Sequence, residues 1–461
     1  MTDVADLVAE LRHAPLSNAA ALIRALGLGS QATLSRLVTR AGDAVVPVGR
    51  ARARRYAAAR DVRGLGTALP LYRVGADGAL SEIGTLRPIV PDGYALERPA
   101  NVARWMRGHR GDGVSEGLPV FLADARPQGF LGRTFARRHA AFGLPDNPEA
   151  WSDDDTIVAL ARGGEDGIGD LVVGRESARR LYASRSQGAQ PIAPEHRTAA
   201  YPALADEAID GVLPGSSAGG EQPKFGALVG PAQDPHHVLV KFSPRDDSAA
   251  AVRWRDLLRC EQWTLHALGS AGFPVPASDL VEGGSRLFLE TSRFDRVGAY
   301  GRLPVVTLSA MNNEYAGMLP AAGHWLEAAE SLAQQRWMLP ATVAQVRCLQ
   351  WFGRFIANTD MHFGNLSFFP QDDGTLALAP VYDMLPMRYA PIGSELPARA
   401  YAPPVPEPGQ EAAWFAAAEI AAGYWDTVAA DARISGGFRA IAAGNASALR
   451  DHVGRFAGRP P

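Results

Sequence analysis

The sequence has almost no lysine. Its 46 Lys and Arg residues include only two lysines, Lys224 and Lys241, and arginine occupies every other basic position. A lysine carries a compact ammonium where an arginine carries a planar guanidinium, so two surviving lysines indicate positions at which a guanidinium is no substitute. The alternative is that these two lysines remain by chance. The sequence around each lysine has to decide between the two explanations.

Cysteine and long apolar segments are also scarce. Cys260 and Cys348 are the only cysteines, and both lie in helix-like stretches, which indicates core side chains of a reduced cytosol rather than disulfides or a metal site. No run of about 18 apolar residues exists, so no membrane-spanning segment is predicted. Residues 1–14 contain acids and lack the apolar core of a signal peptide. We therefore expect a cytoplasmic protein.

The net charge is small, at −3, but it is unevenly distributed. Residues 1–64 hold ten Arg and five Asp or Glu, a net charge of +5, whereas the remainder holds 36 Lys or Arg and 44 Asp or Glu, a net charge of −8. A basic head on an acidic body is typical of a nucleic-acid contact made by the head.

The head has the sequence pattern of a winged helix-turn-helix. Residues 4–15 are amphipathic, Ser17 could cap a second helix, and Ser30 could cap a third helix over residues 31–41. Two strand-like segments follow on either side of Gly49. Alternation in the second segment would place its arginines on one face of the wing.

The third helix and the wing carry the side chains that we expect to contact DNA. The helix would enter the major groove, and the wing would contact the phosphate backbone. The predicted residues are Gln31, Thr33, Arg36, Arg40, Arg50, Arg52 and Arg54. The alternative is a winged helix that binds protein and leaves its arginines solvated. Because operators are often palindromic, DNA binding would favour a homodimer.

The remainder of this α+β chain is expected to form a mixed α/β lobe and then a mostly helical lobe. Short strand signals, broken by Gly, Pro and Asp, occur at residues 70–74, 80–86, 157–161 and 170–174. Residues 184–210 are polar and contain proline, which favours a connector. We expect the units to span residues 1–64, 65–185, 186–320 and 321–461.

Each lysine lies in a segment that suggests phosphate binding. Lys224 ends a Gly/Ser-rich segment in which Gly219 and Gly220 would let backbone N–H groups approach phosphate oxygens. That segment is not a P-loop, and by itself it is equally consistent with a surface turn. Lys241 ends an apolar strand, as the phosphate-binding lysine of kinases does, and Glu261 on the following helix could orient it.

Two further motifs follow in the order that kinases use. Asp360 and Asn365 have the D-x-x-x-x-N spacing of a catalytic loop, in which the Asp accepts the substrate hydroxyl proton and the Asn ligates Mg²⁺. For His362, between them, a structural role is the better interpretation. Residues 366–384 predict a β-hairpin that ends at Asp383, where kinases carry a second metal-binding Asp.

Together the lysines, Asp360, Asn365 and Asp383 form a minimal set for phosphoryl transfer from ATP with Mg²⁺, because this chemistry requires mainly positioning and charge neutralisation. Two alternatives stay open. One is a DNA-binding transcription regulator whose kinase fold is a catalytically silent ligand sensor, although a sensor needs no proton acceptor. The other is a kinase that acts on small molecules.

Several motifs in fixed order resemble the HipA-like serine/threonine-protein kinases of bacterial toxin–antitoxin systems. They are SSAGGEQPK, the strand lysine, ETSRFDR at residues 290–296, NTDMHFGN and APVYDM, and the resemblance covers roughly residues 70–440. It implies a HipA N-terminal subdomain over residues 65–185, followed by a kinase-related fold. A fused N-terminal helix-turn-helix is similar to a smaller subgroup of that family, in which the head would act as an autoregulator or built-in antitoxin.

The resemblance implies roles for individual residues. Ser217, or its neighbour Ser216, would be autophosphorylated in the Gly-rich loop. The adenine hinge would include Phe288 and Glu290, and Arg293 and Asp295 would be structural. The substrate would be a protein, in some relatives part of the translation machinery. The residues that flank Lys224, Pro223 and Phe225, depart from the family pattern, so no particular substrate is inferred.

Overall fold

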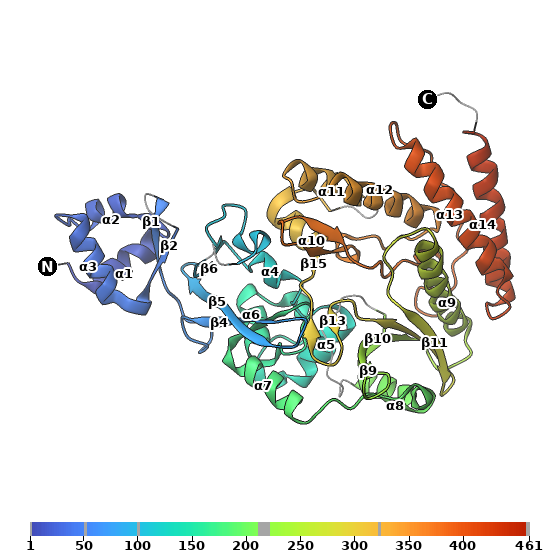
Figure 1. The fold of residues 1–461 in the computed structure, drawn as a ribbon, viewed down its shortest axis with the longest axis horizontal. Coiled ribbons are helices and arrows are strands. Elements are labelled where there is room, and N and C mark those ends of the chain that lie inside the picture. The colour runs from blue at the N-terminus through green and yellow to red at the C-terminus, as the bar shows by residue number, and fades with distance from the viewer. Residues whose placement is uncertain (1, 50–52, 99–101, 211–221, 321–323, 458–461) are drawn as a thin grey trace.

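The computed structural model describes residues 2–49, 53–98, 102–210, 222–320 and 324–457. A helical head lies at one end of the molecule, a middle α/β unit follows it, and the remaining elements form the other end (Figure 1). Helices and antiparallel sheets alternate along the chain, so the expected mixed α/β composition is confirmed. Within these described ranges, no helix combines the length and apolar character needed to cross a membrane.

The head consists of helices α1 (Val4–His13), α2 (Ala19–Ala25) and α3 (Gln31–Ala41) with a sheet of strand order β1-β3-β2. Its strands are β1 (Ser17–Asn18), β2 (Val45–Val48) and β3 (Arg55–Ala58). Ser30 caps α3 as predicted, since its hydroxyl accepts the Thr33 N–H. The predicted cap of α2 was wrong: Asn18 caps that helix, whereas Ser17 donates its hydroxyl to the Ala14 carbonyl.

Apolar packing and ion pairs hold the head against the middle unit. Val46, Val48 and Ala57 of its sheet share an apolar cluster with Ile89 and Ala95. Three ion pairs reinforce this contact: Arg55 with Asp112, Arg60 with Asp154 and Arg63 with Asp155. Several arginines that make the head basic therefore neutralise aspartates of the same chain.

The middle unit contains a sheet of strand order β7-β6-β5-β4-β8. Its strands are β4 (Leu69–Val74), β5 (Leu80–Ile89), β6 (Gly93–Leu96), β7 (Val114–Ser115) and β8 (Leu171–Val173). Its helices are α4 (Val120–Ala123), α5 (Gly129–Arg138), α6 (Asp153–Gly163) and α7 (Gly174–Ser186). The strand expected at residues 157–161 is wrong, because these buried residues lie in α6, which a capping box at Ser152 initiates.

A second sheet, of strand order β11-β12-β10-β9, lies between two helices. Its strands are β9 (Lys224–Val229), β10 (His236–Phe242), β11 (Ser278–Gly283) and β12 (Arg286–Ser292). Helix α9 (Ala249–Ser270) packs on one face. The other face is covered by α8 (Arg197–Asp210), so the connector expected over residues 184–210 is wrong for this part. Tyr201 of α8 is fully buried. Its packing against the sheet stabilises this helix, which the polar sequence of the segment did not predict.

The last lobe is mainly helical, as expected. Its helices are α10 (Leu308–Met311), α11 (Trp325–Gln334), α12 (Pro340–Phe355), α13 (Glu411–Ala430) and α14 (Gly436–Gly454). Short strands β13 (Arg296–Val297) and β14 (Gly301–Arg302) precede them, and β15 (Val306–Thr307) pairs with the hairpin of β16 (Ser367–Pro370) and β17 (Leu376–Leu378). That hairpin is the one predicted between the catalytic loop and Asp383.

Candidate active site

Lys241 and Glu261 form a buried ion pair at the centre of the site. Alternation along β10 directs Lys241 to the face that α9 covers, where the lysine Nζ lies 2.5 and 2.8 Å from the two Glu261 carboxylate oxygens. The side chains are only 5% and 2% exposed. A buried charge requires such a partner, because desolvating an unpaired ion is costly. The structure thus brings together the strand lysine and helix glutamate that the sequence predicted.

Asp383 joins this pair from the segment that follows β17. The Lys241 ammonium donates to Asp383 Oδ1. Burial alone would raise the pKa of Asp383, but the positive charges of Lys241 and Lys224 outweigh burial and hold that pKa below its ordinary value. These positive charges favour the ionised form of the Asp383 carboxyl group. The carboxylates of Asp383 and Glu261 in turn raise the pKa of Lys241 against the effect of burial.

The backbone of Asp383 adopts an uncommon conformation, with φ at +51°. Residues other than glycine rarely occupy this left-handed region, although Asp and Asn tolerate it better than most. Such conformations persist where the surrounding structure enforces them, and they are frequent at functional sites. Here the Asn358 side chain donates to the Asp383 carbonyl at 3.4 Å, which helps to hold the turn.

Lys224 lies beside Lys241, which the sequence did not predict. The two lysines are directly opposite each other in the β9–β10 register, and they are 1% and 4% exposed. Like charges in this arrangement repel each other. The carboxylates of Glu261 and Asp383 balance them, so two ammonium groups and two carboxylates meet on one face of the sheet.

The predicted catalytic loop is held by its own asparagines. Asn358 Oδ1 accepts the Asp360 N–H at 3.0 Å, and Asn365 Nδ2 donates to the Asp360 carbonyl at 2.7 Å. Both bonds involve only the backbone of Asp360, whose side chain is exposed. Asn358 was not among the predicted site residues. Its signal is an Asx-type turn, in which an Asn side chain accepts the N–H two residues further on.

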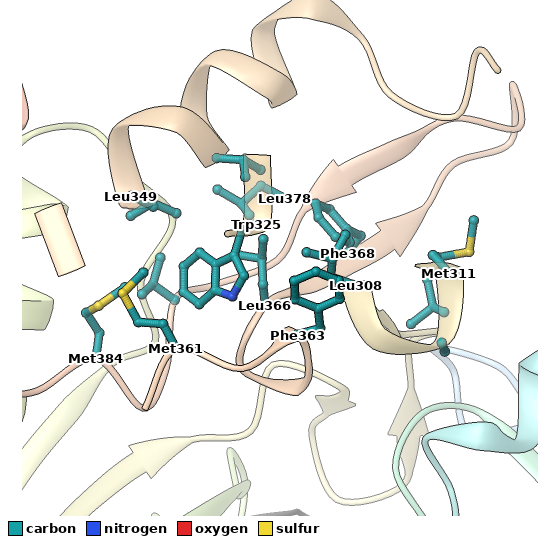
Figure 2. Packing of buried hydrophobic residues seen from close by; sticks show 14 of the residues in the cluster. Leu308, Met311, Trp325, Leu349, Met361, Phe363, Leu366, Phe368, Leu378 and Met384 are labelled. Carbon is teal, nitrogen blue, oxygen red and sulfur yellow. The ribbon is translucent and has the colours of Figure 1, made fainter. Parts of the chain in front are cut away.

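Apolar side chains pack against the loop and anchor it (Figure 2). Met361, Phe363 and Leu366 point into a core that includes Trp325 and Met384, and each of these side chains is at most 3% exposed. Trp325 also donates its indole N–H to the His362 carbonyl at 3.1 Å. Buried apolar side chains therefore flank Asp360 and Asn365 along this loop, which fixes where these two residues are presented.

Two predicted nucleotide-contacting side chains lie on the face of the sheet opposite Lys241. Phe288 and Glu290 alternate with Leu289, so they face α8, whereas Lys241 faces α9. Phe288 is fully buried in aromatic contacts, and Glu290 is bound by Tyr201 and by Arg197. Their strand is central and pairs on both sides, so its backbone is committed to the ladders rather than to an adenine.

Of the remaining predicted residues, some lie outside the described residues and the others lie elsewhere in the described chain. Ser216, Ser217, Gly219 and Gly220 lie outside the described residues, as do Arg50 and Arg52. On α3, Gln31, Arg36 and Arg40 are exposed and Thr33 is partly buried. Arg54 is exposed but precedes β3, so its expected place within the alternating strand is wrong. Arg293 and Asp295 form a buried ion pair at 2.8 Å, consistent with a structural role.

Comparison with known proteins places this chain in a family. The profile described as the HipA-like C-terminal domain matches residues 216–442, and the profile described as the YjjJ-like toxin, middle domain, matches residues 65–182. The chain is 38% identical over 417 residues to Toxin YjjJ of Escherichia coli (strain K12), which covers 90% of each protein. The chain belongs to the HipA-like toxin family.

A solved structure of a HipA shares the fold. It is the HipA of Shewanella oneidensis MR-1 in complex with HipB and its operator DNA, and the match has a TM-score of 0.53 at 16% identity. It covers 84% of this HipA-like chain and 97% of the other. The chain therefore has the mixed α/β fold of a HipA.

Proposed function

We propose that this HipA-like protein is an ATP-dependent serine/threonine-protein kinase. The observation that carries the proposal is the cluster of the buried Lys241 and Glu261 with the partly exposed Asp383. Asn358 links this cluster to the loop that carries the exposed carboxylate of Asp360. A ligand sensor would need the phosphate-binding lysine but no exposed proton acceptor on an anchored loop. The silent-sensor alternative is disfavoured on this ground.

The chemistry of these side chains fits ATP and Mg²⁺. Asn365 uses its amide nitrogen for the Asp360 carbonyl, so its amide oxygen is the atom left to act as a ligand. With the ionised Asp383 it supplies the oxygen ligands that Mg²⁺ prefers. Lys224 and Lys241 would hold the phosphates. When bound, Mg²⁺ would neutralise the charge that develops on the transferred phosphoryl group.

Different residues of the chain have different roles in phosphoryl transfer. Glu261 fixes the direction of the Lys241 ammonium, so the lysine meets a phosphate without first being reoriented. Asp360 orients a serine or threonine hydroxyl of the substrate and accepts its proton. Asn358 and Asn365 hold the backbone on both sides of that carboxylate, which limits its position relative to the nucleotide.

Autophosphorylation is the first test of this proposal. We expect purified wild-type protein with Mg²⁺ and γ-labelled ATP to incorporate label at Ser217 or Ser216. The Asp383→Asn variant should incorporate at least 100-fold less label, because the substitution weakens both a magnesium ligand and a carboxylate that binds Lys241. Phosphosite mapping by mass spectrometry distinguishes the two serines. Equal labelling of the wild type and Asp383→Asn would contradict the assigned site.

We further propose that the head is a winged helix-turn-helix that binds DNA, acting as an autoregulator or built-in antitoxin. Leu34 and Leu37 bury one side of α3 in the head core, which leaves Gln31, Arg36 and Arg40 on the exposed side. The HipA of Shewanella oneidensis is seen with a separate HipB and operator DNA. A DNA-binding segment within the same chain would make such a second protein unnecessary.

Removing two arginines from α3 should weaken DNA binding without affecting the kinase. For Arg36→Ala with Arg40→Ala we expect at least tenfold weaker binding to a duplex from the region upstream of its own gene. The slope of log affinity against log salt should fall by about two, because each phosphate contact contributes about 0.9. Fluorescence anisotropy at several salt concentrations measures both quantities.

The matched control is Arg433→Ala with Arg450→Ala, which removes the same charge from exposed positions of the last lobe. This control should keep the affinity and the slope of the wild type. Equal behaviour of the two double variants would favour a head that contacts protein instead of DNA.

A further inference from the structure

A pocket of about 220 Å³ opens beside the catalytic loop. Its lining includes Asn358 and Thr359 of the loop, Arg354 at the end of α12, and Arg388 and Tyr401 from the segment after Asp383. Alanine and proline side chains complete its walls. Thr359 directly precedes Asp360, so the pocket lies one residue along the chain from the carboxylate that would activate the substrate hydroxyl.

Two arginines give the pocket positive charge, and a carboxylate neutralises only one of them. Arg354 donates to Glu407 at 2.9 Å, which offsets its charge. Arg388 is anchored through Nε, which donates to the Ala400 carbonyl at 2.8 Å. Among the described residues no carboxylate forms an ion pair with Arg388. Its remaining guanidinium donors are therefore available for an acidic ligand.

The other polar atoms of the pocket suit the same kind of ligand. Tyr401 donates its hydroxyl proton to the Phe355 carbonyl at 2.7 Å, which fixes the ring against the wall. The Thr359 side chain is exposed and offers a hydroxyl donor. Small-molecule sites usually measure about 300–1,000 Å³, so this smaller volume fits a side chain of a larger ligand better than a separate metabolite.

The segment that supplies Arg388 and Tyr401 also exposes apolar side chains. Ile392, Leu396 and Val405 are 62%, 37% and 59% exposed. Of these, Val405 directly follows Pro404, which lines the pocket. An exposed apolar side chain next to the pocket in the sequence can contact the backbone or side chains of a bound peptide.

We propose that this pocket binds an acidic side chain of the protein substrate, close in sequence to the serine or threonine that is phosphorylated. The proposal rests on the proposed kinase function and specifies its substrate class. Arg388 is the specificity-determining residue, because it supplies the guanidinium that Glu407 does not neutralise. A fork of parallel N–H donors binds a carboxylate or a phosphate with defined geometry.

Peptide binding tests the pocket independently of catalysis. Fluorescein-labelled peptides would carry one serine in an alanine–glycine background, with a single Asp placed at each position from four before to four after it. We expect the wild type to bind about tenfold more tightly when Asp occupies one or two adjacent positions. A parallel set with phosphoserine in place of Asp distinguishes a carboxylate site from a phosphate site.

Arg388→Gln should abolish the positional preference, whereas Arg388→Lys, which keeps the charge, should retain part of it. Arg399→Gln is the matched control, since Arg399 is exposed on the same segment but does not line the pocket. A wild type without positional preference, or a preference that survives in Arg388→Gln, would overturn the proposal. Selective binding without phosphoryl transfer to any peptide would instead contradict the kinase function alone.

Discussion

Replacing Asp360 by Asn is expected to slow phosphoryl transfer by about 10²–10⁴-fold, the usual contribution of a positioned general base. The fold should be unaffected. Asn358 and Asn365 contact only the N–H and carbonyl of Asp360, and both groups persist in the variant. The exposed side chain loses its negative charge and its capacity to accept a proton, and nothing else in the loop has to move.

Single-turnover measurement with γ-labelled ATP separates this effect from nucleotide binding. The affinity for Mg-ATP, measured by calorimetry, should stay within about threefold of the wild type because Lys241, Asn365 and Asp383 are intact. Asp372→Asn is the matched control, since this exposed Asp in the hairpin turn undergoes the same chemical change outside the site. Turnover by Asp360→Asn at the rate of this control would exclude Asp360 as the base.

The parts of the site that could be predicted depend on local sequence. A lysine at the end of an apolar strand, a glutamate on the next helix and an Asp after a hairpin each have a signature within about twenty residues. Lys241, Glu261 and Asp383 meet in the structure as those signatures indicated. Their order along the chain also pointed to the family before any geometry was available.

The parts that could not be predicted depend on register. Side chains in a strand alternate between faces, so an assignment that ignores register can place every residue on the wrong side. Phe288 and Glu290 were expected at the nucleotide but face α8, while Lys224 was expected in a loop but lies opposite Lys241. Pairing between β9, β10 and β12 decides these positions, and no single segment encodes it.

Burial and partner choice explain the remaining differences. The apolar run at residues 157–161 is buried on all sides, so periodicity could not distinguish a strand from α6. From composition alone, the positive charge of the head predicts attraction to DNA. In the structure Arg55, Arg60 and Arg63 pair with aspartates of the middle unit. The argument for DNA therefore rests on α3, since composition counts charges without showing where their partners lie.

Replacing Lys241 by Met should destabilise the second sheet by about 3–5 kcal/mol, which is the usual effect of removing one partner of a buried ion pair. Met has a similar length to Lys and fills the space that the lysine side chain leaves. The destabilisation therefore comes from the lost charge and not from a new cavity. The substitution removes the bonded counter-charge of the Glu261 carboxylate, which is 2% exposed, and leaves Lys224 alone to balance Glu261 and Asp383. Burial already raises the pKa of Glu261, and loss of the lysine should raise it further.

Hydrogen exchange followed by mass spectrometry measures this effect locally, which suits a chain of several units. We expect amides of β10 and α9 to exchange about 10²–10⁴-fold faster in Lys241→Met, while those of the head keep their wild-type rates. The double variant Lys241→Met with Glu261→Met removes both charges and should recover most of the protection, because a well-packed apolar pair can replace a buried ion pair. It should nevertheless remain unable to transfer phosphate. Unchanged exchange in Lys241→Met would contradict the buried pair, and kinase activity in the stable double variant would contradict its catalytic role.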